Sequence, residues 1–161
     1  MNALIVYDSE FGNTERIAYA IAKQLGTARV IRAAEVDTLD HVTCDLLLVG
    51  GPTQRHRASP TLHTLLERLP HGALKGVPAA AFDTRYRMSE FLSGSAAAWI
   101  AGRLKRAGAR LVLPPESFFM ERDVPPQSEK RRHEREHLES GEEERAAAWA
   151  NALLTGMTAT G

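Results

Sequence analysis

The stretch YDSEFGNTERIA, residues 7–18, marks a change from one type of secondary structure to another. Before it, Ala3–Tyr7 (ALIVY) is a continuous apolar run, as expected of a strand that is buried on both faces. After it, Ile17 and Ile21 are four residues apart, and Gly26 follows where a helix commonly ends. The stretch therefore predicts a buried strand, a short polar loop and a helix.

The same alternation continues along the chain. Further strands are predicted at Arg29–Ala33, at Leu46–Val49 (ended by Gly50-Gly51-Pro52), at Val77–Phe82, and at Leu111–Leu113 resumed at Phe118–Met120. Further helices are predicted over Pro60–Leu69, Ser95–Ala107 and about Glu142–Leu154. Two prolines interrupt the fifth strand, and because proline cannot donate to a strand ladder, we expect this strand at an edge of the sheet.

Strands that alternate with helices predict an α/β fold with a mostly parallel sheet and right-handed crossovers. Five such strands suit a doubly wound, three-layer sandwich with the strand order 2-1-3-4-5. Ligands of these folds bind at the carboxyl ends of the strands, where the strand order reverses. Three loops are expected at that edge, namely Asp8–Thr14, Gly50–Ser59 and Asp83–Ser95.

The composition narrows the class of protein. A length of 161 residues predicts a single domain over residues 1–161, in which the charged segment 121–141 connects to the C-terminal helix. The formal net charge of +0 gives no general attraction to nucleic acid or to an anionic membrane, and no apolar run is long enough to span a bilayer.

The cellular location is expected to be the cytoplasm. The single cysteine, Cys44, cannot form an intrachain disulfide, which is typical of a reducing compartment. The start, MNALIVYDSE, lacks the basic and long apolar regions of a signal peptide, so we interpret it as the first strand.

The first loop is suited to binding a phosphate. Backbone N–H groups at a helix N-terminus attract an anion without a cationic side chain. Ser9, Asn13 and Thr14 can add donors, and Gly12 allows a close approach to the backbone. The loop matches neither the triphosphate nor the dinucleotide motif, which favours a single terminal monophosphate. The alternative interpretation is that Asn13 and Thr14 only cap the helix.

Two other activities of similar folds are excluded by position. A phospho-accepting receiver domain needs an aspartate at the end of the third strand, where this chain has Gly50, Gly51 and Pro52. A low-molecular-weight phosphatase needs Cys-x5-Arg after the first strand, whereas Cys44 precedes the third strand and Gly50 stands six residues later.

The three loops together resemble those of the flavodoxin family. Ser9–Thr14 (SEFGNT) is similar to the family's phosphate loop [ST]-x-[TYF]-G-[NT]-[TS], and Gly51–Thr53 (GPT) to the start of its loop after strand 3. Asp83–Tyr86 (DTRY) resembles the D-x-x-Y loop after strand 4, whose tyrosine stacks on the flavin. Gly141–Trp149 is also similar to the start of the family's closing helix. The resemblance spans nearly the whole chain and implies a flavodoxin-like three-layer sandwich.

By this resemblance the cofactor is flavin mononucleotide (FMN), with its phosphate on residues 9–14 and its ring between the second and third loops. Tyr86 is expected to stack on the ring. No side chain is assigned a catalytic or metal-ligating role. The residues implied to bind the cofactor are Ser9, Glu10, Phe11, Gly12, Asn13, Thr14, Pro52, Thr53, Gln54, Arg55, His56, Asp83, Thr84, Arg85 and Tyr86.

The chain also departs from the family. Family members usually place an aromatic residue in the loop after strand 3, where this chain has Gln54-Arg55-His56-Arg57. Typical carriers are strongly acidic, whereas this chain is neutral. Together with Arg85 and Arg87, the loop arginines are expected to flank the ring, either as solvated charges or close to the pyrimidine edge of the flavin.

Three functions follow from these observations. The first is an FMN-binding flavodoxin-like electron-transfer flavoprotein that passes electrons between redox partners. The second is an FMN-dependent reductase of quinones or other small-molecule acceptors. The third is a flavin-free binding or regulatory module on the same fold. The expected partner is a redox protein or a small-molecule acceptor, not nucleic acid, and no membrane span is expected.

Overall fold

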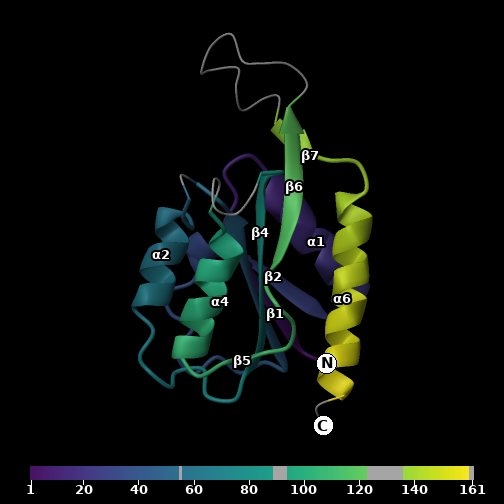
Figure 1. Cartoon of the computed structure of the whole chain (residues 1–161). Helices are drawn as coiled ribbons and strands as arrows, with labels where there is room; N and C mark the ends of the chain where they lie inside the picture. Colours follow the sequence, from purple (N-terminus) through teal and green to yellow (C-terminus); the bar gives the residue numbers. More distant parts are fainter. Residues whose placement is uncertain (55, 89–93, 123–135, 160–161) are drawn as a thin grey trace.

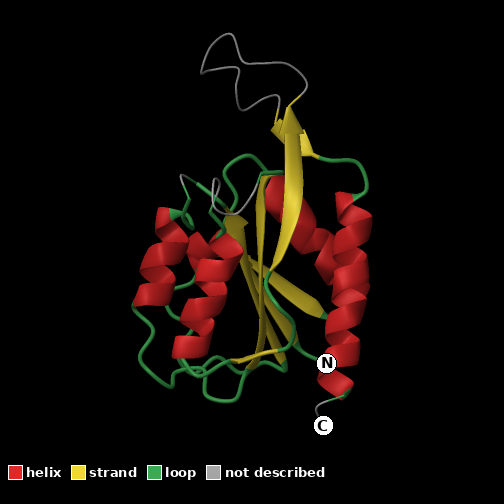
Figure 2. Ribbon diagram, in the orientation of Figure 1, coloured by secondary structure: helices red, strands yellow, loops and turns green. Residues whose placement is uncertain are grey.

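The structure, a computed structural model, describes residues 1–54, 56–88, 94–122 and 136–159. They form three layers, with one sheet between two pairs of helices (Figure 1, Figure 2). The strands are β1 (Ala3–Tyr7), β2 (Ala28–Arg32), β3 (Leu46–Pro52), β4 (Pro78–Tyr86), β5 (Arg110–Leu111), β6 (Glu116–Arg122) and β7 (Glu136–Leu138). The helices are α1 (Asn13–Leu25), α2 (Pro60–Glu67), α4 (Ala96–Arg106) and α6 (Glu142–Thr158), with a short 3₁₀ turn at Ala33–Glu35.

The sheet confirms the predicted strand order. Its path is β2-β1-β3-β4-β6-β7, and β5 pairs with the start of β4. The predicted fifth strand thus corresponds to β5 and β6 together. All pairs are parallel except the added antiparallel pair of β6 with β7. The central strands are buried on both faces, as their continuous apolar runs predicted.

Two strands extend further than expected toward the carboxyl edge. β3 was expected to end before Gly50-Gly51-Pro52, but these three residues form its last part. Asp83–Tyr86 was expected in the loop after the fourth strand, but it belongs to β4. The reason is continued pairing, because Gly51 lies opposite Asp83 and the end of β4 also pairs with β6. Gly50 fits because the Phe82 ring fills the space of a side chain, with its Cζ 2.2 Å from an added Cβ position.

The prediction that the fifth strand lies at an edge holds for β5 and is wrong for β6. The upper part of β6 pairs with β7, which comes from the charged segment of the chain. Further down, the Glu142 carboxylate accepts the N–H of Phe119 at 2.8 Å, and Arg145 donates to the carbonyl oxygen of Ser117. Side chains at the start of α6 therefore satisfy backbone groups that an edge strand would leave to solvent.

A hydrophobic core lies on each face of the sheet. On one face, α1 and α6 cover the sheet, and Trp149 of α6 packs on Phe82 and Phe118, the three rings making edge-to-face contacts with centroids 6.0–6.4 Å apart. On the other face, α2 and α4 bury apolar stripes that include Leu62 and Ile100. Among the described residues, no helix combines the length and the apolar character that a membrane span needs.

The packing around Gly50 can be tested with a matched pair of alanine substitutions. Gly50→Ala places a Cβ against the enclosed Phe82 ring and should destabilise the fold by about 1–3 kcal/mol, as overpacking does. Gly102→Ala, on the exposed side of α4 with no atom near the added Cβ, should stabilise it by about 0.4–1 kcal/mol. Urea unfolding measures both, and equal effects of the two substitutions would contradict the packing of Gly50.

Candidate functional site

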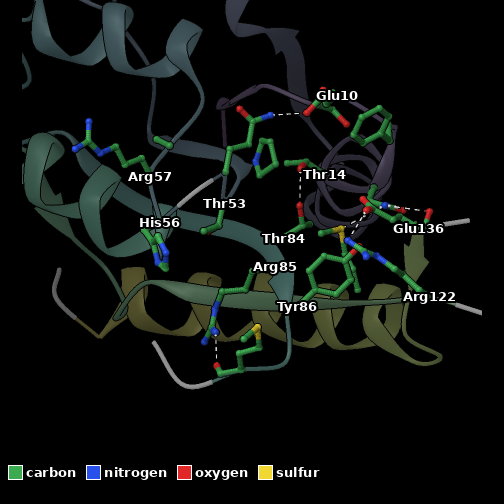
Figure 3. Close-up of a pocket in the computed structure, with 18 of the residues that line it drawn as sticks. Glu10, Thr14, Thr53, His56, Arg57, Thr84, Arg85, Tyr86, Arg122 and Glu136 are labelled. Carbon is green, nitrogen blue, oxygen red and sulfur yellow. Dashed lines mark hydrogen bonds and ion pairs between the residues drawn. The ribbon is translucent and has the colours of Figure 1, made fainter. Parts of the chain in front are cut away.

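A cavity of about 900 Å³ opens at the carboxyl ends of the central strands (Figure 3). Its volume is in the upper part of the usual range for small-molecule and cofactor sites. Figure 3 shows His56 and Arg57 on one side, and Tyr86, Arg122 and Glu136 on the other. The lining residues are Ser9, Glu10, Phe11, Asn13, Thr14, Pro52, Thr53, Gln54, His56, Arg57, Ala58, Pro60, Thr84, Arg85, Tyr86, Met88, Met120, Arg122 and Glu136.

The start of α1 presents backbone donors to this cavity. Gly12 is the N-cap residue, and its left-handed conformation (φ 91°) turns the chain into the helix. The Ser9 hydroxyl accepts the N–H groups of Gly12 at 3.0 Å and Glu15 at 3.4 Å. Helix geometry leaves the N–H groups of Asn13 and Thr14 without an intrahelical acceptor. These amides and the helix dipole are suited to an anion.

The side chains of Asn13 and Thr14 hold α1 to the sheet. The Thr14 and Thr84 hydroxyls share a buried hydrogen bond of 2.7 Å. Asn13 Nδ2 donates to the carbonyl oxygen of Glu136 and to the Met120 sulfur, both at 3.4 Å. Neither side chain caps the helix, so the alternative interpretation of these two residues is wrong. The groups that these two residues leave available to an anion are their backbone amides.

Tyr86 is held by two residues that no sequence motif indicated. Arg122 Nε donates to the Tyr86 hydroxyl oxygen at 2.6 Å, and Arg122 Nη2 pairs with Glu136 Oε1 at 3.0 Å. Burial, with a smaller contribution from the hydrogen bond to Glu136, raises the pKa of Tyr86 to about 12. The Arg122 guanidinium lies over the Tyr86 ring, 4.6 Å from its centroid.

The loop after β3 forms a tight turn at the cavity. Gln54 and Arg57 exchange two backbone hydrogen bonds of 2.8 and 2.9 Å. His56 within this turn has a left-handed conformation (φ 71°), which is uncommon for a residue other than glycine. Gln54 Nε2 also donates to the Glu10 carboxylate at 2.6 Å, which links the second loop to the first.

The arginines near the cavity are mostly engaged with the protein itself. Arg85 is buried, and it donates to the Ser117 hydroxyl at 2.9 Å and to the carbonyl oxygen of Met88 at 2.8 Å. Arg87 is not in the lining; it makes a two-pronged contact with Glu139, whose pKa it lowers. The expectation of solvated loop charges is therefore wrong for Arg85, while Arg57 is exposed in the lining.

Most residues that the sequence singled out line one cavity, with three exceptions. Gly12 contributes backbone only, Asp83 is buried beneath the lining, and Arg55 lies outside the described residues. The lining also contains residues that sequence reasoning did not name as site residues, namely Ala58, Pro60, Met88, Met120, Arg122 and Glu136. Arg122 and Glu136 belong to the charged segment, where only the pairing of β7 with β6 brings them to the site. In the described part of the chain, no cluster of His, Cys, Asp and Glu is arranged to hold a metal ion.

Comparison with known proteins connects this site to a family. A family model described as Flavodoxin matches residues 5–149 of the chain. No curated protein sequence matches the chain significantly. Among solved structures, oxidised flavodoxin 1 from Bacillus cereus aligns with a TM-score of 0.74 at 17% identity, covering 96% of this chain and 98% of that one.

Two further solved structures show the breadth of the similarity. A flavodoxin, WrbA-like protein from Agrobacterium tumefaciens aligns with a TM-score of 0.70 at 17% identity, covering 98% of each chain. Rubredoxin:oxygen oxidoreductase from Desulfovibrio gigas aligns with a TM-score of 0.66 at 17% identity, covering 98% of this chain and 36% of that one. At these identities the similarity establishes the fold.

The environment of Tyr86 predicts a late titration. Its pKa of about 12 lies above the ordinary value of about 10, so the stability that Tyr86 contributes is present below the lower value and is lost as the pH rises toward the higher one. Subtracting the tyrosinate absorbance of Tyr86→Phe from that of the unmodified protein isolates this titration. Glu136→Gln should shift it to lower pH, because the Glu136 carboxylate helps to keep the phenol neutral. A difference curve centred at the ordinary tyrosine value would contradict the described environment.

Proposed function

The chain belongs to the flavodoxin family, and on that premise we propose that it binds FMN at this cavity and transfers electrons between redox partners. The observation that carries the proposal is the start of α1, where two backbone amides without intrahelical acceptors face a cavity that also holds an aromatic ring. A phosphate group and a flat aromatic group on one ligand suit this pair of features.

The donor set fits a monophosphate. The N–H groups of Asn13 and Thr14 lie where the helix dipole favours negative charge. Gly12 leaves open space beside the loop, with no atom within 4 Å of an added Cβ. Among the described residues of the lining there is no lysine, which suits a ligand with one phosphate better than a nucleoside triphosphate.

The rest of the cavity fits a flavin ring. A flat, largely apolar ring needs apolar and aromatic surfaces around it. In the lining these come from Pro52, Tyr86, Met88 and Met120. FMN, when bound, supplies one- and two-electron redox chemistry, while the protein supplies binding and orientation. We therefore assign the stacking role to the ring of Tyr86.

The rim of the cavity favours a protein as the redox partner. Phe11 and Met88 are large apolar side chains with 40% and 50% of their surface exposed, and both line the cavity. Exposed apolar groups around a cofactor site mark a surface that a partner covers. We propose that the carrier acts in the cytoplasm as a single domain.

Flavin titration tests the proposal directly. Purified protein incubated with FMN should give a flavin visible spectrum, and FMN should bind at least about tenfold more tightly than riboflavin, because charge-assisted hydrogen bonds to phosphate are each worth about 1.5–3 kcal/mol. Equal affinities would contradict the phosphate site. Steady NAD(P)H oxidation with a quinone would instead indicate an FMN-dependent reductase, and no flavin binding at all would indicate a binding or regulatory module.

Glu10 gives a gain-of-affinity test of the phosphate site. Its exposed carboxylate lies in the proposed phosphate loop, and glutamine in its place can still accept the hydrogen bond from Gln54. Removing one exposed negative charge should tighten FMN by about two- to fivefold, leave riboflavin unchanged, and lose effect at high salt.

Asp45→Asn serves as the matched control for Glu10→Gln. Asp45 is also exposed, but it precedes β3 at the opposite end of that strand from the cavity. Its neutralisation should leave the affinities for FMN and riboflavin unchanged. An equal gain in FMN affinity in both variants would show that the effect of Glu10 is not local to the loop.

A further inference from the structure

Asp83 is a completely buried carboxylate directly beneath the cavity. It has 0% exposed surface and is not part of the lining, although Thr84 and Arg85 after it are. Its Oδ2 atom accepts three hydrogen bonds, from the Thr53 hydroxyl at 3.0 Å, the Ser95 hydroxyl at 2.9 Å and the Ala97 N–H at 2.9 Å. One carboxylate oxygen is therefore the meeting point of three donors.

These donors come from two segments that are far apart in the sequence. Thr53 begins the turn after β3 that lines the cavity, whereas Ser95 and Ala97 lie at the start of α4. The Thr53 hydroxyl also accepts the Ala96 N–H at 2.9 Å, so its own proton is directed to Asp83. We call these five residues, Thr53, Asp83, Ser95, Ala96 and Ala97, the Asp83 cluster.

A second contact joins the same two segments. His56 forms an isolated parallel β-bridge with Gly94, which directly precedes Ser95 of the Asp83 cluster. An added Cβ on Gly94 would lie 2.6 Å from the His56 Cα, so the two backbones lie too close together for any side chain at position 94. The turn after β3 is thus fixed at Thr53 by hydrogen bonds and at His56 by backbone contact.

The charge of Asp83 is costly to bury and is only partly compensated. The three hydrogen bonds and the N-terminus of α4 favour the carboxylate, and Arg85 Nε lies 3.9 Å from its other oxygen, Oδ1. Oδ1 itself is buried without a hydrogen-bond partner. A buried charge rarely stabilises a fold more than a well-packed apolar side chain would. The burial of Asp83 therefore points to a role in fixing a particular geometry.

We propose that Asp83 is a positioning residue for the flavin ring. By holding Thr53 and the start of α4 together, it fixes the turn that carries Gln54, His56 and Arg57 as one wall of the cavity. The identity of the ligand rests on the proposed function, but the mechanical role of the cluster does not. Asp83 acts through the turn and does not touch the ligand itself.

Asp83→Asn tests the role while keeping the shape of the side chain. The amide presents one oxygen and two unwanted N–H donors to the three donors of the cluster, which should loosen the turn. FMN and riboflavin should then both bind about tenfold more weakly, by the same factor, because the hydrogen bonds of the cluster described above join the turn to α4 and not to α1. Glu10→Gln, in contrast, should change the affinity for FMN alone.

Hydrogen exchange supplies a readout that needs no flavin. In Asp83→Asn the amides of Ala96 and Ala97 should exchange faster, whereas the buried interior of α1 at Ile17–Ile21 should be unchanged. Ser95→Ala removes one donor to Asp83 and also the N-cap acceptor of the Ala98 N–H, so it should raise the exchange of Ala96 and Ala97 less than Asp83→Asn does and raise that of Ala98 as well. It is the second variant if Asp83→Asn does not fold.

The outcomes separate the two proposals. An equal loss of affinity for both flavins together with local loss of exchange protection supports the positioning role. Unchanged flavin affinities, a loss for FMN alone, or exchange that rises equally throughout the chain would overturn it. If the unmodified protein binds no flavin, the proposed function fails, and the exchange result alone then supports or overturns the role of the cluster.

Discussion

The hydrogen-bonded register of β1, β3 and β4 is the constraint on which the rest of the structure depends. Tyr7 lies opposite Gly50, and Gly50 lies opposite Phe82, so the three strands end at one edge of the sheet. This register requires glycine at position 50, where the Phe82 ring occupies the space of a side chain. Every described segment that lines the cavity follows one of these strands or pairs with one of them, except Glu136 in β7, which is joined to them through β6.

The site gains its polarity from backbone dipoles and paired charges. The start of α1 supplies backbone N–H groups to the proposed phosphate site, and the carboxylate of Glu10 in the same loop opposes an anion there. Around the rest of the cavity, Arg85 is close to Asp83 and Arg122 pairs with Glu136. A neutral chain can therefore hold an anionic ligand without the strong local positive potential that four loop arginines would suggest.

The second half of the cavity is built by an addition to the parallel sheet. β6 extends past the ends of the neighbouring strands, and β7 pairs with that extension (Figure 1). Arg122 and Glu136 face each other across this antiparallel pair and hold Tyr86 from one side. The orientation of Tyr86, the proposed stacking residue, thus depends on β7. This strand lies in the charged segment 121–141, whose composition is typical of a connector.

The sequence by itself determined most of the elements and their order along the chain, but not β7. Ala3–Tyr7 and Leu46–Val49 are continuous apolar runs, and the spacing of Ile17 and Ile21 specifies a helix, so local patterns were enough to predict the alternation of strands and helices. These features are encoded within about ten neighbouring residues, because strand and helix periodicities repeat over that length.

Only the tertiary structure decided where the side chains of those loops find their partners. Thr14 bonds to a hydroxyl 70 positions away, and Asn13 to a carbonyl oxygen 123 positions away, so neither caps its own helix. Asp83, which the D-x-x-Y pattern placed in a loop, is buried because β4 continues through it. Such partners are set by strand register and by the closing antiparallel pair, and no local sequence pattern carries that information.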